Sequence, residues 1–472
     1  MTHPLVDRPS RLERDALERA LDRVCRARAI PGNAVTHLTD GPQAFGSMLS
    51  LIEGARRWIH FENYIIRSDS TGEIFAEHLA EAARRGVQVR ILYDHLGSRG
   101  TSRSYWKRLR RAGAEVRAFN RVNPLRPLKS LRRDHRKYVS ADGTDGVIGG
   151  ICIGDEWAGA PADGRPPWRD AAVEIRGPAV PALDLTFLRL WQAAGGTAPV
   201  DQAPSRLDPC GAAAVRVVDG VPGRLRLYRA MELLVAGAAE RLWLTDAYLV
   251  VATPLFASLM AAARDGVDAR LLVPGHSDIP TIRALTRVGY RELLHAGVRI
   301  WEWHGPMLHA KTIIADDTWF KVGSSNLNPS SFLSNHELDV LVEDRAIAAS
   351  AAQQYRRDLG HAVEIVLRPR RAPERLATRL PPAVVPAQPR PLRTGQIRAR
   401  KELSRRAAVT LRKVAGGARR SVAGAIIFTL LGSGVLLIAV PRVMAYALAV
   451  VCFWLGGAAV WQFLERRRHW ED

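Results

Sequence analysis

The chain has 472 residues, and its 68 lysines and arginines outnumber 47 acidic residues, giving a formal net charge of +21. That length predicts roughly three structural units of about 150 residues each. The hydrophobic fraction of 47% excludes a wholly disordered chain. The four cysteines (Cys25, Cys152, Cys210 and Cys452) form no CxxC pair, which excludes a disulfide-rich scaffold and a cysteine-based zinc site.

The first 38 residues are charged throughout and predict a small helical segment. They contain no apolar run of the kind found in a secretory signal peptide, so we expect none.

An internal repeat organises the central part of the chain. ARRWIHFENYII (55–66) parallels AERLWLTDAYLV (239–250), and EAARRGVQVRILYD (81–94) parallels AAARDGVDARLLVP (261–274). Each copy contains an Ala-rich amphipathic run, a glycine (Gly86 or Gly266) and a β-branched run, which is typical of helices packed on a largely buried sheet. We therefore predict two α/β lobes, residues 39–198 and 216–367, joined by a linker at 199–215.

The C-terminal part differs in composition. Residues 368–420 are rich in proline and arginine and predict a basic linker that is drawn to anionic lipid. Nucleic-acid binding is the competing interpretation. Residues 421–465 contain two uncharged stretches, 422–440 and 443–464, each long enough for a transmembrane helix, with a buried soluble hairpin as the alternative. Basic residues flank both outer ends, so the positive-inside rule predicts that the lobes are cytoplasmic.

The chemistry is predicted in the last repeated block. HRKYVSADGTDGVIGG (135–150) parallels HAKTIIADDTWFKVGS (309–324), so His135, Lys137 and Asp142 recur as His309, Lys311 and Asp316. Residues i and i+2 of a strand face the same way, so each motif presents an imidazole beside an ammonium group. Two such pairs suit a phosphate: one imidazole attacks phosphorus, the other protonates the leaving oxygen, and the lysines balance charge without a metal or cofactor.

The paired HxKxxxxD motifs resemble those of the phospholipase D superfamily. Segments such as IHFENYIIRSDSTG, GPMLHAKT and GSSNLNPSSFLSNHELDV resemble bacterial cardiolipin synthases more narrowly. This resemblance, which spans residues 39–366, implies two α-β-α sandwich lobes with one shared active site. It also implies that two phosphatidylglycerol molecules are joined through a phosphatidyl-histidine intermediate, with release of glycerol.

The resemblance also implies roles for single residues. His135 corresponds to the nucleophile and His309 to the general acid, an assignment that could be reversed. Lys137, Lys311, Ser324 and Asn326 correspond to phosphate ligands. Asp170 and Glu337 stand where the family places a carboxylate that orients a catalytic histidine, with a solvated strand-end acid as the alternative. Asp142 and Asp316 complete the motifs and are expected to be structural rather than chemical. Cys152 stands where the family usually has asparagine.

These inferences define the expected partners and the competing functions. We expect anionic phospholipid substrates, a bacterial inner-membrane location with two spans, no nucleic-acid partner, and a monomeric active site built by both lobes. The alternatives are another phosphatidyl donor such as phosphatidylethanolamine, hydrolysis of the donor, a nuclease, and a non-catalytic membrane scaffold.

Overall fold

The computed structural model describes residues 11–121, 130–160, 163–197, 207–250 and 253–367. The predicted basic linker and membrane hairpin lie outside these residues. No helix within the described ranges has the length and apolar character needed to cross a membrane.

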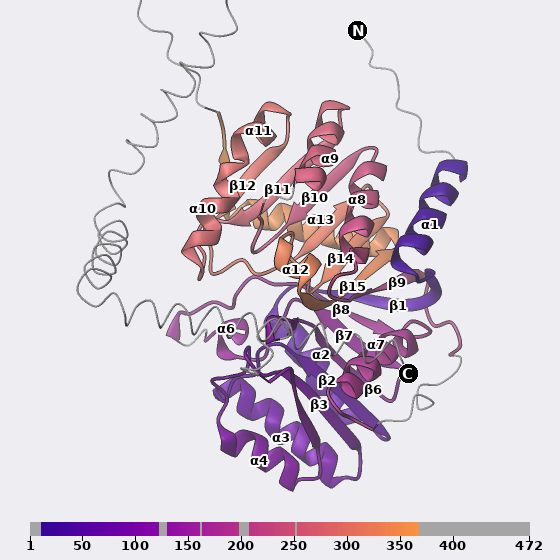
Figure 1. Cartoon of the computed structure of the whole chain (residues 1–472), viewed down its shortest axis with the longest axis vertical. Coiled ribbons are helices and arrows are strands. Elements are labelled where there is room, and N and C mark those ends of the chain that lie inside the picture. The colour runs from indigo at the N-terminus through magenta and orange to yellow at the C-terminus, as the bar shows by residue number, and fades with distance from the viewer. Residues whose placement is uncertain (1–10, 122–129, 161–162, 198–206, 251–252, 368–472) are drawn as a thin grey trace, which may run out of the picture. The chain divides into compact units, whose positions relative to one another are not determined.

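The described residues form two lobes of alternating strands and helices (Figure 1). The first comprises α1 (Arg11–Cys25), β1 (Ile30–Leu38), α2 (Gly41–Gly54), β2 (Trp58–Asn63), α3 (Ser70–Arg84), β3 (Gln88–Asp94), α4 (Arg103–Arg111), β4 (Glu115–Phe119), β5 (Arg133–Asp134), β6 (Lys137–Ala141), β7 (Asp145–Gly149), α6 (Asp155–Ala158), β8 (Ala172–Arg176) and α7 (Val180–Ala193).

The second lobe repeats this series. It comprises β9 (Ala213–Gly220), α8 (Arg226–Gly237), β10 (Arg241–Thr245), α9 (Thr253–Arg264), β11 (Asp268–Pro274), α10 (Pro280–Val288), α11 (Tyr290–His295), β12 (Arg299–Trp303), β13 (Thr312–Ala315), β14 (Trp319–Gly323), α12 (Pro329–Leu333), β15 (Asn335–Glu343), α13 (Arg345–Leu359) and β16 (Ala362–Ile365).

The strand order demonstrates the duplication. Outward from the centre, the first half runs β1-β8-β7-β6-β2-β3-β4 and the second runs β9-β15-β14-β13-β10-β11-β12, so equivalent strands occupy equivalent places. The halves meet where β1 and β9 pair antiparallel. The predicted duplicated α/β architecture is therefore confirmed for the described residues.

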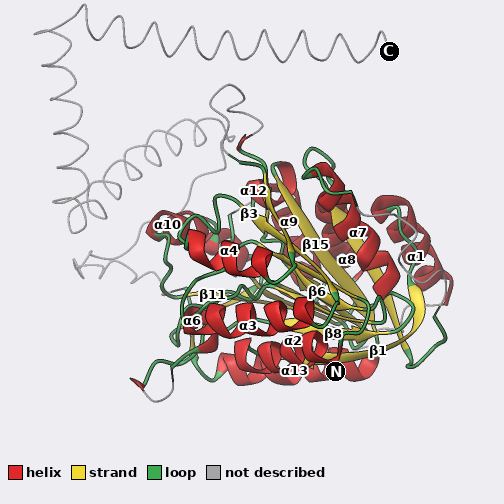
Figure 2. Cartoon of the chain, turned by 90° about the horizontal axis from the view of Figure 1, so that it is seen from below, coloured by secondary structure: helices red, strands yellow, loops and turns green. Residues whose placement is uncertain are grey.

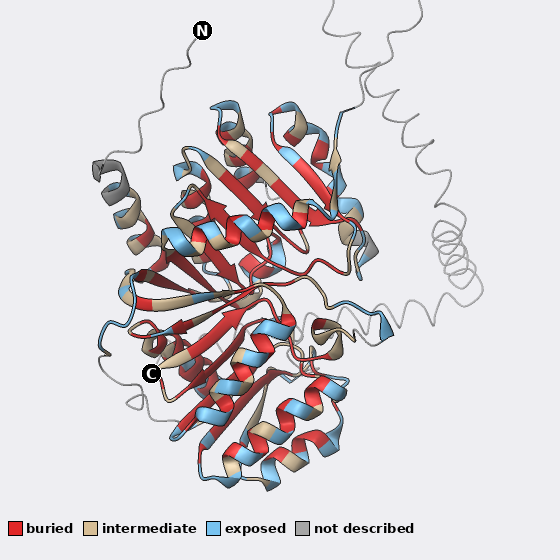
Figure 3. Ribbon diagram, turned by 180° about the vertical axis from the view of Figure 1, so that it is seen from behind, coloured by how far each residue is buried: buried red, intermediate tan, exposed pale blue. Residues whose placement is uncertain are grey.

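The core is continuous across the two lobes. Helices cover both sides of the strands, with α2 and α13 on one side and α7 and α8 on the other (Figure 2). Phe187 and Trp191 from α7 belong to the same buried cluster as Tyr355 from α13 and Trp243 from β10. The strands are buried and the outer faces of the helices are exposed (Figure 3). Apolar burial thus holds the two lobes as one unit.

Local sequence determines where the helices begin and end. Asp40, Asp69 and Asp344 precede α2, α3 and α13, and each carboxylate accepts a backbone N–H of the first turn. Gly86 and Gly266, which follow α3 and α9, have φ values of +90° and +95°, a conformation that favours glycine. The predicted series of helix, glycine and strand is confirmed in both copies.

The N-terminal region contains the expected charged helix, α1, but it also contains a strand that was not expected. Residues 30–38 form β1, which pairs with β8, so the first sheet begins before residue 39. The charged helix α1 packs Leu21 and Cys25 against α8. The buried Arg216 on β9 bonds Glu18 and Asp22 of α1, which ties this helix to the second lobe.

The motif aspartates lie at the far ends of strands β6 and β13 from the motif lysines. Asp142 accepts the backbone N–H groups of Arg56, Arg57 and Trp58 at 2.7–3.0 Å. Asp316 does the same for Ala239, Glu240 and Arg241. Both aspartates have positive φ, 55° and 53°. These side chains join a hairpin to the start of the neighbouring strand, in line with the structural role expected for them.

We expect Asp142→Ala to lower the free energy of unfolding by about 2 kcal/mol, because several backbone donors lose a charged acceptor. Asp142→Asn is the matched control, since asparagine tolerates positive φ and keeps one acceptor oxygen. Denaturant unfolding of the three proteins measures the difference. Equal stability of the alanine variant and the wild type would contradict this role.

Candidate functional site

Each motif histidine lies at the start of a central strand, next to the boundary between the lobes. His135 precedes β6 and His309 precedes β13, and their exposed fractions are only 9% and 5%. The two sites influence each other, because Lys311 acts electrostatically on His135 and Lys137 acts on His309. The structure therefore brings both motifs into one buried cluster.

The carboxylates that bond the histidines are exchanged between the lobes. Nδ1 of His135 lies 3.0 Å from Oε2 of Glu337, at the start of β15 in the second lobe. Nδ1 of His309 lies 2.6 Å from Oδ2 of Asp170, just before β8 in the first lobe. Bonding at Nδ1 leaves Nε2 of each ring as the nitrogen that can react.

Backbone bonds repeat the same exchange. The N–H of His135 donates to the carbonyl of His336 at 2.9 Å, and the N–H of His309 donates to that of Arg169 at 2.7 Å. In both cases the acceptor is the residue immediately before the partner carboxylate. Each histidine is therefore held by backbone and side chain of the opposite lobe, so the site requires both.

The motif lysines are almost completely buried beside the histidines. The ammonium group of Lys137 donates to the carbonyl of His135, and that of Lys311 donates to the carbonyl of His309. Nζ of Lys311 also lies 2.9 Å from Nδ1 of His309. An anion that reached both histidines would therefore meet two buried positive charges.

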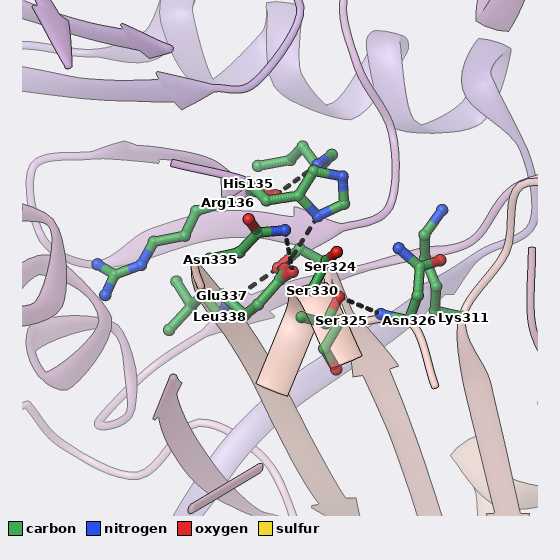
Figure 4. A network of polar contacts seen from close by, with 12 residues as sticks. His135, Arg136, Lys311, Ser324, Ser325, Asn326, Ser330, Asn335, Glu337 and Leu338 are labelled. Carbon is green, nitrogen blue, oxygen red and sulfur yellow. Dashed lines mark hydrogen bonds and ion pairs between the residues drawn. The ribbon is translucent and has the colours of Figure 1, made fainter. Parts of the chain in front are cut away.

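The residues that follow the two motifs are not equivalent. Ser324 donates its hydroxyl hydrogen to Glu337 at 2.5 Å and accepts the N–H of Leu338, so that hydrogen is used on the carboxylate rather than offered to a phosphate (Figure 4). Gly150 holds the corresponding place, and a Cβ there would lie 2.2 Å from Oδ1 of Asp170. In place of a serine, the indole of Trp157 donates to Asp170 at 3.0 Å.

Asn326 and Cys152 complete the predicted set. Asn326 is buried, its backbone N–H donates to the hydroxyl oxygen of Ser331 at 3.1 Å, and its Oδ1 has no hydrogen-bond partner within the described residues. Cys152, at the matching place of the first copy, is 1% exposed. Burial raises the pKa of its thiol, although Lys137 opposes the shift. The thiol is therefore neutral at pH 7.

Four aromatic side chains around the histidines were not predicted from the sequence. The ring of Tyr64 lies edge-on to His135 at 4.8 Å, and Tyr248 lies edge-on to His309 at 5.8 Å. Trp157 and Trp168 add further contacts to His309, at 5.4 and 5.9 Å. The two tyrosines hold equivalent places in the repeat (ENYII and DAYLV), a signal that could have identified them.

Burial and charge determine the protonation of the cluster. Burial, assisted by Lys311, lowers the pKa of His309 to about 3, and burial also lowers the pKa of His135. Burial alone would raise the pKa of Glu337, but His135, Lys137 and Ser324 hold it at about 2. Both imidazoles are therefore neutral at pH 7 in the empty site, and their carboxylate partners are ionised.

A cavity of about 730 Å³ opens next to His309. Its lining includes Trp168, which contacts the His309 ring, and Met307, two residues before that histidine. Arg67 and Arg165 line the same cavity. It has the size of a small-ligand site. Its wall carries both signs of charge, because Asp69, Asp155 and Glu156 also line it and Arg67 pairs with Glu156 at 3.0 Å. Within the described residues, no group of three or more His, Cys, Asp or Glu side chains is arranged to hold a metal ion.

The fold and the paired histidine motifs define a phospholipase D-like protein. The family described as "Cardiolipin synthase, PLD-like domain" matches residues 48–155 and 233–359. Cardiolipin synthase A of Pseudomonas aeruginosa is 32% identical over 360 residues, covering 76% of this chain and 73% of that protein. The corresponding protein of Pseudomonas entomophila is 33% identical over 361 residues, covering 76% and 75%.

One solved structure shares the fold. Phosphatidylserine synthase from Haemophilus influenzae Rd KW20 superimposes with a TM-score of 0.60 at 13% identity, covering 74% of this chain and 92% of that one. The chain belongs to the cardiolipin synthase family of phospholipase D-like phosphatidyltransferases, which confirms the resemblance inferred from the sequence.

The protonation of Lys311 predicts an alkaline limit on activity. Burial lowers the pKa of Lys311 to about 8. The positive charge of Lys137 adds to this shift, and the carboxylate of Asp170 opposes it. Above that pH the ammonium group loses its proton, so kcat/KM for a phosphodiester should fall about tenfold per pH unit. Lys311→Arg should move this limit upward by at least about one unit, because the guanidinium group keeps its charge. An unchanged alkaline limit in a folded Lys311→Arg protein would contradict this assignment, and the exposed Lys107→Arg is the control.

Proposed function

We propose that the protein is a membrane-anchored cardiolipin synthase that converts two phosphatidylglycerol molecules to cardiolipin and glycerol. The observation that carries this proposal is the exchanged pair of histidine–carboxylate bonds, His135–Glu337 and His309–Asp170, with a buried lysine beside each ring. Two similar rings in one site suit a double displacement at phosphorus, and the family membership favours a phosphatidyl group as the part transferred.

In the first half-reaction, Nε2 of His135 attacks the phosphorus of one phosphatidylglycerol. A nitrogen–phosphorus bond forms and the bond from phosphorus to the headgroup oxygen breaks. His309 gives its Nε2 proton to the leaving glycerol, and Glu337 stabilises the positive charge that develops on the His135 ring. Lys137 and Lys311 balance the charge of the non-bridging oxygens.

In the second half-reaction, neutral His309 removes a proton from a hydroxyl of the second phosphatidylglycerol. The resulting oxygen attacks phosphorus, the nitrogen–phosphorus bond breaks, and cardiolipin leaves. His309 is then protonated again for the next cycle. The roles of the two histidines could be reversed, because both have the same kind of partner.

The low pKa of His309 in the empty site fits this cycle. A general acid must carry a proton, and an anionic phosphate entering the cluster raises the pKa of a nearby imidazole. Substrate binding would therefore favour protonation of His309, with Asp170 accepting the hydrogen bond from Nδ1.

Water and other alcohols could replace the second phosphatidylglycerol. Hydrolysis to phosphatidic acid and transfer from phosphatidylethanolamine are therefore alternative reactions of the same site, and a nuclease is a more distant one. Incubation of the full-length enzyme with phosphatidylglycerol, phosphatidylethanolamine or plasmid DNA separates them. Cardiolipin and glycerol formed in equal amounts from phosphatidylglycerol alone would support the proposal, whereas cleavage of DNA without lipid turnover would refute it.

We expect His135→Ala and His309→Ala each to abolish turnover, and the double variant to be hardly worse, because residues that act as a unit are not additive. With a nitrophenyl phosphodiester, whose leaving group needs no acid, His309→Ala should still accumulate a phospho-adduct on His135. Mass spectrometry under mildly alkaline conditions detects this adduct. An adduct on His309 in the His135→Ala protein would instead reverse the roles.

The anchoring hairpin generates a separate prediction. Residues 422–440 and 443–464 are proposed to cross the membrane, with both ends and the lobes in the cytoplasm. A chain truncated after Leu367, which keeps β16 paired with β12, should be recovered without detergent. A reporter fused after Asp472 should be inaccessible from outside intact cells, and external labelling of that reporter would show that the orientation is wrong.

A further inference from the structure

Five arginines line a second cavity that shares no lining residue with the one beside His309. Its volume is about 460 Å³, and it lies between the end of α1 and the loop that leads into α8. Val24, Gly223 and Leu225 line it together with the five arginines, which are Arg23, Arg26, Arg224, Arg226 and Arg229. No acidic residue is part of this lining, so the cavity concentrates positive charge.

No side chain of the described residues forms a direct pair with this charge. Within the described part of the chain, none of the five guanidinium groups forms an ion pair or a side-chain hydrogen bond. Burial lowers the pKa of Arg226, and Asp219 opposes this shift. The nearby Arg224, Arg26 and Arg189 lower the pKa further, because their positive charges repel that of Arg226. By contrast, a 550 Å³ cavity beside α4 contains Arg84 and Arg108, which pair with Glu77 and Glu73. Clustered arginines repel one another, so an anion that separates them is stabilising.

The geometry suits a phosphate. Guanidinium groups bind phosphate oxygens through paired N–H donors. Arg226 is the first residue of α8, a helix of 12 residues, so the positive end of the helix dipole lies at this cavity. Arg26 contributes from a left-handed conformation, with φ of 53°, at the end of α1. The predicted charged segment at the N-terminus, to which the sequence assigned no role, thus supplies two of the five arginines.

Exposed leucines beside the arginines favour a lipid over a free phosphate. Leu225 lines the cavity and is 38% exposed, and Leu333 is 56% exposed. The loop that carries Leu225 lies beside the end of α12, because the N–H of Gly223 donates to the carbonyl of Leu333 at 3.1 Å. Arginines next to exposed apolar side chains are typical of protein surfaces that contact anionic membranes. Leu333 is the last residue of α12, so the exposed end of this short helix lies next to the loop that carries Gly223.

We propose that the cavity lined by Arg23, Arg26, Arg224, Arg226 and Arg229 binds the phosphate of an anionic phospholipid headgroup at the membrane surface. It is a second lipid site, separate from the paired histidines. The choice of a lipid rests on the proposed function, whereas the phosphate chemistry rests on the arginines alone.

The test is hydrogen–deuterium exchange of the full-length protein in an uncharged detergent, titrated with dihexanoyl-phosphatidylglycerol. Peptides that cover 20–28 and 221–232 should become protected. Arg26→Gly combined with Arg224→Gln should raise the lipid concentration needed for protection by roughly fivefold per arginine. Glycine suits the backbone at residue 26, and Arg224 is exposed, so the double variant should remain folded. Lys107→Gln combined with Arg111→Gln, which removes the same charge elsewhere, is the matched control.

Additional arms distinguish the ligands. Inorganic phosphate at the same concentration should protect these peptides only weakly, and equal protection by phosphate would overturn the lipid assignment. Protection by plasmid DNA but not by the lipid would make this surface a nucleic-acid interface. An unchanged lipid midpoint in the double arginine variant would refute the site.

Peptides around His135 and His309 provide an internal control. Their protection by the lipid reports binding at the candidate active site. Protection at the arginine cavity without protection at the histidines would count against the proposed function while leaving this inference intact. The reverse result would refute the inference alone.

Discussion

The exchange of carboxylates between the two lobes is the constraint on which the site depends. Glu337 of the second lobe bonds His135 of the first, and Asp170 of the first bonds His309 of the second. A buried carboxylate without a partner is strongly destabilised, so each lobe needs a group from the other to stabilise its own acid. The continuous core and the β1–β9 pairing bring these groups within hydrogen-bond distance. Packing of the lobes and assembly of the site are therefore one event.

Much of the fold could be predicted because each copy of the repeat shows its helices and strands in short stretches of sequence. The segments around Gly86 and Gly266 identified equivalent helices and strands, and the HxK spacing identified the buried His and Lys pairs. Short-range patterns do not show which carboxylate reaches which histidine, because Glu337 lies 202 residues from His135 and Asp170 lies 139 residues from His309. The resemblance placed Asp170 and Glu337 beside a histidine, but the exchange between lobes is visible only in three dimensions. Strand β1 was missed for a related reason, since its pattern is irregular and its partners β8 and β9 are distant in sequence.

The two halves keep the same geometry with different side chains. Asp170 receives a hydrogen bond from Trp157, and Glu337 receives one from Ser324. Gly150 explains the difference, because any side chain there would collide with Asp170, so the donor must come from elsewhere. The copies also differ at Cys152, which holds the place that Asn326 holds in the second copy. A buried thiol is a weaker hydrogen-bond partner than an amide. A duplicated fold thus supplies two similar halves that can specialise for different steps of one reaction.

The buried lysines and carboxylates around the histidines explain why both rings are neutral in a site that suits an anion. Two lysines and two carboxylates are buried with them, and charges of opposite sign reduce the cost of removing each from water. The rings then remain neutral because burial and the adjacent lysines disfavour a further positive charge. When a phosphate enters, it adds negative charge to the same cluster and shifts this balance toward an imidazolium. In the empty protein both rings are neutral, so it holds no protonated acid. A neutral nucleophile and a protonated acid become possible together once the substrate adds its negative charge to the cluster.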